Sequence, residues 1–103
     1  MSWHHAPAHH FACGNTFFLT GATAYKEHFY REPIMLDELH EILFNNAEKH
    51  QCVLQSWCLL SNHYHLVVRG EGANVRQMVT RLHTEAARAR NKRRFRLPTR
   101  FEV

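Results

Sequence analysis

The pattern of apolar and polar positions predicts two helices separated by strands. Apolar residues recur at helical spacing over residues 36–49, with charged residues elsewhere on the helical wheel. A second helix is expected after the glycines at positions 70 and 72, with Asn74 as its N-cap. The following residues form the expected buried stripe of this second helix: Val75, Met78, Val79, Leu82 and Ala86.

Short apolar runs predict strands over residues 15–23, 52–60 and 63–69. The run over 52–60 is apolar on both faces, which indicates a central strand or one buried in a dimer. Ser61 and Asn62 form a turn that should join the last two runs as an antiparallel hairpin. Residues 96–103 are expected to add a short edge strand.

This order of elements, β-α-β-β-α-β, predicts an α+β domain of the ferredoxin-like type. Such a domain has an antiparallel sheet with both helices on one face. Residues 15–103 are expected to form this single domain. Residues 1–14, which contain several histidines and little periodicity, are expected to form a flexible N-terminal arm.

The charge of the chain is distributed unevenly between its two halves. Residues 1–50 contain three Lys/Arg against six Asp/Glu, whereas residues 51–103 contain ten against three. Such asymmetry is typical of a protein with a polyanionic partner, and nucleic acid is favoured over the alternative of a solvated basic tail. The residues expected to contact nucleic acid are Arg69, Arg81, Arg88, Lys92, Arg93 and Arg94.

The three cysteines indicate the compartment. They are odd in number and contain no C-x-x-C pair, which favours reduced thiols in a cytoplasmic protein over a disulfide or zinc framework. Cys52 and Cys58 are expected to be small core residues. No apolar run approaches the roughly 18 residues of a membrane span, and no signal-peptide pattern opens the chain.

Two histidines one residue apart, His63 and His65, lie within the apolar run over residues 63–69. Because successive strand side chains point to opposite faces, both imidazoles should project from one face and Tyr64 from the other. Two imidazoles held side by side on a strand are suitable ligands for a divalent ion, Mg²⁺ or Mn²⁺. The alternative is a pair of half-exposed histidines on a sheet surface.

The segment Leu60-Ser61-Asn62-His63-Tyr64-His65-Leu66-Val67-Val68 resembles the signature of the HUH tyrosine transposases. This family comprises single-strand transposases of the small insertion-sequence type and their REP-associated relatives. Ser61 stands where the family usually has proline. The resemblance covers about residues 16–92, because the elements around the signature also come in the family's order.

The resemblance implies a homodimer that acts on single-stranded DNA beside an imperfect hairpin. It also implies a divalent ion held by His63, His65 and a third polar ligand. In the family, a tyrosine on a helix beyond the last strand attacks phosphorus and forms a 5′-phosphotyrosine. Tyr25, Tyr30 and Tyr64 do not match the position of that nucleophile, so we expect a truncated or non-cleaving member and assign no catalytic tyrosine.

Three functions therefore remain open. The first is a transposase that retains the metal pair, with cleavage impaired or absent. The second is a non-catalytic module that binds single-stranded nucleic acid. The third is an unrelated metal-dependent hydrolase, in which Glu71 and Glu85 are the candidate acidic ligands.

Overall fold

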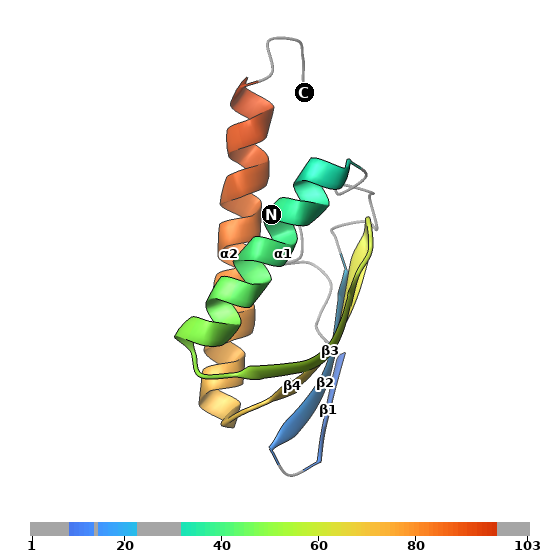
Figure 1. Ribbon diagram of the computed structural model, residues 1–103, viewed down its shortest axis with the longest axis vertical. Coiled ribbons are helices and arrows are strands. Elements are labelled where there is room, and N and C mark those ends of the chain that lie inside the picture. The colour runs from blue at the N-terminus through green and yellow to red at the C-terminus, as the bar shows by residue number, and fades with distance from the viewer. Residues whose placement is uncertain (1–8, 14, 23–31, 97–103) are drawn as a thin grey trace.

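A four-stranded antiparallel sheet with both helices on one face forms the part of the chain that the computed structural model describes, residues 9–13, 15–22 and 32–96 (Figure 1). The elements in chain order are β1 (His9–Cys13), β2 (Thr16–Ala22), α1 (Pro33–Lys49), β3 (Val53–Leu59), β4 (His63–Arg69) and α2 (Gly72–Arg96). The strand order is β1-β2-β4-β3. The predicted α+β class and the β3–β4 hairpin are confirmed.

The topology is compatible with the ferredoxin-like prediction. Strands β2 and β3 run parallel on either side of β4 and are connected through α1, which is a split β-α-β unit. A second such unit would place a strand after α2 beside β2, on the side away from β4. In the structure β1 lies at that position. Residues 97–103, where the last strand was expected, lie outside the described residues, and Arg96 belongs to α2.

The predicted N-terminal arm is wrong for its last residues. His9–Cys13 form strand β1, which pairs with β2 from Cys13 opposite Thr16 to His9 opposite Thr20. Two adjacent histidines interrupt any alternation of apolar and polar positions here, so the sequence pattern did not indicate a strand. The rest of the predicted arm, residues 1–8, lies outside the described residues.

The helices begin earlier than predicted. Helix α1 begins at Pro33, a favourable first helical position because the missing N–H of proline would have no intrahelical partner there. The Val75 N–H donates to the Glu71 carbonyl at 2.9 Å, and α2 begins at Gly72. Asn74 therefore lies inside the first turn of α2, and its prediction as the N-cap is wrong.

The core lies between the helices and the covered face of the sheet. Its largest fully buried apolar side chains are Tyr64, Leu39, Leu43, Leu66, Met78, Leu82 and Val68. The predicted buried stripe of α2 is confirmed, with Val79 partly buried at its margin. Asn46 of α1 is buried with this core, and its side-chain amide donates to Glu85 of α2 at 3.0 Å. This hydrogen bond joins the two helices.

Strand β3 lies at an edge of the sheet, so its prediction as a central strand is wrong. Val53 is 58% exposed and Trp57 is 42% exposed. The prediction of a core position is confirmed for Cys52, where burial raises the pKa of the thiol, but it is wrong for Cys58, which is exposed. An apolar pattern on both faces does not distinguish a central strand from an exposed edge. The alternative that this strand is buried in a dimer stays a prediction.

Neither helix of the described chain has the long uncharged apolar stretch that crossing a bilayer requires.

We expect Gly21→Ala to lower the free energy of unfolding by about 1–3 kcal/mol through overpacking. A Cβ at this position would lie 2.5 Å from Cε2 and Cζ of Tyr64, whose ring is fully buried. Gly72→Ala is the matched control, since its Cβ would meet Phe17 Cζ at 3.6 Å, an ordinary contact. Urea unfolding of both variants checks this, and a Gly21→Ala protein as stable as wild type would contradict it.

Candidate metal centre

Strand β4 places the two histidines on the open face of the sheet, the face away from the helices. Tyr64 and Val68 are fully buried toward the helices, whereas His65 and Arg69 are exposed and His63 is partly exposed. The predicted alternation along this strand is confirmed. The imidazoles therefore share one face.

Tyr64, which separates the two histidines in sequence, is anchored on the covered face. Its hydroxyl lies 2.8 Å from Nε2 of His83 on α2. Burial raises the pKa of the Tyr64 hydroxyl, so this group stays neutral. Because it points into the helix layer, Tyr64 cannot attack a phosphate bound at the open face.

The imidazoles of His63 and His65 lie next to each other and are nearly perpendicular. Their ring centroids are 5.1 Å apart and their planes meet at 87°. An ion bound to a ring nitrogen lies roughly 3 Å from the centre of that ring, so these two rings are close enough to share one ion. The separation fits the predicted metal pair.

Two hydrogen bonds hold the rings through their Nδ1 atoms. His63 Nδ1 lies 2.8 Å from Asn62 Oδ1, and His65 Nδ1 lies 3.4 Å from Thr20 Oγ1. An imidazole whose Nδ1–H donates a hydrogen bond has an unprotonated Nε2, which is the form that binds a metal. The donor set is therefore suitable for Mn²⁺, which accepts imidazole nitrogen together with oxygen ligands.

Residues 15–22 and 32–91, whose side chains the structure describes, supply no third ligand of the His, Cys, Asp or Glu type. No group of three or more such side chains that could hold an ion occurs among them. Glu85 belongs to the helix layer, where it contacts Asn46 and Arg81. Glu71 follows β4 at the end away from His63. Within the described chain, the hydrolase hypothesis therefore has no acidic ligand for its metal.

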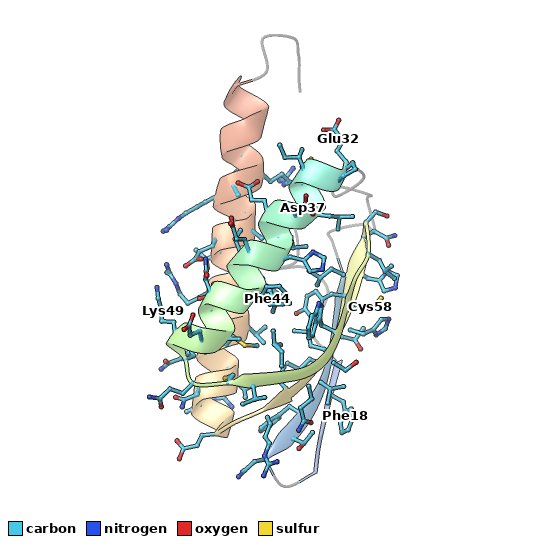
Figure 2. The ribbon with its side chains drawn as sticks, viewed as in Figure 1. Phe18, Glu32, Asp37, Phe44, Lys49 and Cys58 are labelled. Carbon is cyan, nitrogen blue, oxygen red and sulfur yellow. The ribbon has the colours of Figure 1, made fainter. Side chains whose placement is uncertain are left out.

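On β2, β4 and β3, whose side chains the structure describes, the open face contains three further rows of paired residues. His65 lies between Thr20 and Cys58. The next row contains Phe18, Val67 and Ser56, and the third contains Thr16, Arg69 and Val53. Figure 2 shows Phe18 and Cys58 on the side of the sheet away from the helices. None of these three strands contains Asp or Glu.

Sequence reasoning missed Phe18 and Cys58 as neighbours of the histidines. The alternation within β2, in which Leu19 and Gly21 are buried, could have assigned Phe18 and Thr20 to the other face. No local signal in the sequence places Cys58 opposite His65, because this depends on strand pairing.

The structure separates the basic residues that sequence reasoning grouped as one DNA-binding set. Arg69 lies on the open face with the histidines. Arg81 and Arg88 are on α2, across the sheet from them, and Arg81 pairs with Glu85 at 3.1 Å. The predicted residues Lys92, Arg93 and Arg94 belong to the last turns of α2, and only their backbone is described.

Comparison with known proteins agrees with the resemblance drawn from residues 60–68. A family model described as "Transposase IS200 like" matches residues 17–102, which include both histidines and both helices. No curated protein matches the chain.

We expect the protein to bind Mn²⁺ in calorimetric titration, and His63→Ala or His65→Ala to abolish the binding. Asn62→Ala should weaken it by about 10–100-fold, because the hydrogen bond that orients His63 is lost. Affinity should fall as the pH is lowered, since a protonated imidazole cannot bind a metal.

His40→Ala is the matched control for this titration. His40 lies on α1, where its Nδ1 contacts the Leu36 carbonyl at 2.9 Å, and its removal should leave manganese affinity unchanged. Undiminished binding in both the His63 and the His65 variant would show that the ion binds elsewhere in the chain.

Proposed function

The chain belongs to the IS200-like transposase family, and we propose that it binds single-stranded or hairpin DNA on the open face of its sheet. In this proposal His63 and His65 hold a divalent ion, Mn²⁺ or Mg²⁺, beside a DNA phosphate. The observation that carries the proposal is the geometry of the pair. Two imidazoles on one strand face are oriented through Nδ1, with centroids 5.1 Å apart.

An ion bound at this pair would polarise a phosphodiester and neutralise charge that develops on it. The chain's own residues have separate roles in the proposal. His63 and His65 bind the ion, while Asn62 and Thr20 fix the ring orientations. Water and phosphate oxygens would supply the remaining ligands of an ion held by these two histidines.

The charge distribution supports DNA as the partner. The second half of the chain carries ten of its thirteen Lys/Arg residues. Arg69 is exposed at the end of β4, and strands β2, β3 and β4 contain no carboxylate that would repel a phosphate. The basic end of α2, which contains Lys92, Arg93 and Arg94, provides a second region of positive charge.

A non-catalytic DNA-binding module is the second candidate function. It is favoured by the position of the Tyr64 hydroxyl, which contacts His83 within the helix layer and cannot reach the open face. Tyr25 and Tyr30 lie outside the described residues. In both candidate functions the protein uses the same face for DNA, and they differ in whether strand transfer follows.

The homodimer expected from the resemblance is proposed to form through the edge strand β3. This strand is uncharged, and edge strands that remain exposed are usually protected by charges or proline. Its exposed Trp57 packs edge-to-face on Phe44 of α1 with ring centroids 5.2 Å apart, so an exposed apolar surface continues from the strand onto the helix.

Light scattering after size-exclusion chromatography tests this dimer. We expect wild type to be dimeric and Val53→Lys to be monomeric, because a charge would then lie on the pairing edge. Gln77→Lys, at an exposed position on α2, is the matched control and should remain dimeric. A dimeric Val53→Lys protein would rule out this edge.

We expect labelled hairpin DNA with a single-stranded flank to bind in a salt-dependent way, measured by fluorescence anisotropy. Each phosphate contact contributes about 0.7 to the slope of log affinity against log salt for single strands. Replacing Lys92, Arg93 and Arg94 together by alanine should therefore reduce the slope by about 2. Arg81→Ala is the comparison variant. Because the Arg81 guanidinium already pairs with Glu85, this variant should change the slope less than the triple variant does. An affinity that does not change between low and moderate salt would contradict the proposal.

A denaturing gel of the same mixture with Mn²⁺ separates the two candidate functions. DNA cleavage or a protein–DNA adduct that is lost in His63→Ala supports the transposase. Salt-dependent binding without either product supports the non-catalytic module, which is the result expected if no tyrosine of this chain reaches the metal pair.

A further inference from the structure

Phe18 is a large aromatic side chain exposed on the open face of the sheet. It projects from β2 away from the helices, whereas Leu19 beside it is buried in the core (Figure 2). Phe18 is 43% exposed. Phe18 lies beside the candidate metal centre, in a sheet whose strands β2, β3 and β4 contain no carboxylate.

The strand register places Phe18 between the histidine pair and Arg69. Thr20 lies opposite His65, Phe18 opposite Val67 and Thr16 opposite Arg69. Phe18 and His65 are therefore diagonal neighbours, which lie about 7–8 Å apart in an antiparallel pair. Arg69 follows in the next row, about 7 Å farther along the strand. The order along the face is metal pair, aromatic ring, cation.

This order matches the chemistry of an extended single strand of nucleic acid. Bases stack on exposed aromatic rings of sheet surfaces, and phosphates on either side require positive charge. The rows around Phe18 contain Thr, Val, Ser, Cys and Arg but no carboxylate. A protein partner is less well matched to this surface. Its recognition would not require a metal pair, an aromatic ring and an arginine arranged in one line.

We propose that Phe18 is a base-stacking subsite for the nucleotide next to the phosphate at His63 and His65. Arg69 contacts the phosphate on the other side of that nucleotide. This inference rests on the proposed DNA-binding function. It specifies the path of the DNA strand across the open face of the sheet. Because every base has an aromatic face, the subsite accepts any base and positions the strand without reading its sequence.

The test compares affinities for a short single-stranded thymidine oligonucleotide by fluorescence anisotropy. Phe18→Ala should lose about 5–100-fold in affinity with an unchanged salt slope, because stacking releases no counterions. Phe18→Trp should retain or improve binding. Arg69→Ala should reduce the salt slope by about 0.7, as for the loss of one phosphate contact on a single strand.

Ile34→Ala is the matched control, since Ile34 is 55% exposed on α1 in the helix layer. It should leave DNA affinity unchanged. Thermal unfolding of the Phe18 variants should match that of wild type, which separates loss of stacking from loss of structure.

A series of oligonucleotides, each with one abasic position, locates the stacked nucleotide. In wild type, an abasic site at one position should lower affinity as much as Phe18→Ala does. In the Phe18→Ala variant, an abasic site at that position should lower affinity no further.

If wild type does not bind the oligonucleotide, the proposed function itself fails. If wild type binds and Phe18→Ala binds equally well, the stacking subsite is wrong while DNA binding stands. A change in oligomeric state with unchanged DNA affinity would instead assign this face to a second copy of the chain.

Discussion

The ring of Tyr64 lies against Gly21 of the neighbouring strand, where no side chain larger than hydrogen fits, and its hydroxyl lies 2.8 Å from His83. This packing fixes which residues of β4 face the helices. A shift of one residue would expose Tyr64 and turn both imidazoles into the core. Burying two imidazoles without hydrogen-bond partners is unfavourable. The candidate metal pair therefore depends on the burial of the residue between its two members.

In the proposed function, the open face combines three features that act on the same kind of ligand. The histidine pair can hold an ion, Phe18 presents an aromatic surface, and Arg69 carries a positive charge, all within the rows set by β2 and β4. The helix layer has a different role. Its polar contacts, such as the hydrogen bond from Asn46 to Glu85, join α1 to α2. The helix-covered face thus supplies stability, and the other face is the one we propose for DNA.

The sequence pattern predicted those features that depend on local periodicity. Alternation in the 63–69 run placed His63 and His65 on one face, and helical spacing identified the buried stripe around Met78 and Leu82. These predictions succeed because a side chain's direction within a strand or helix follows from its own element. The fold class followed from the order of the same elements.

Features that depend on how elements are placed in the sheet could not be predicted. The edge position of β3 left Cys58 exposed, although its apolar sequence also suits a buried strand. The predicted fold already had both helices on one face of the sheet, but the sequence alone did not show that Arg81 and Arg88 of α2 are therefore separated from Arg69 on the open face. Strand β1 was missed because strand pairing, rather than a pattern in its own residues, defines it.

The most direct test of a metal centre on the open face is NMR of the isotope-labelled protein during titration with Mn²⁺. A paramagnetic ion broadens signals near it, so the amides of His63, His65 and Thr20 should disappear first. Signals of Leu43 and Leu82, which lie in the helix layer, should persist at the same manganese concentration. Broadening that begins in the helix layer, or that leaves His63 and His65 unaffected, would contradict the account.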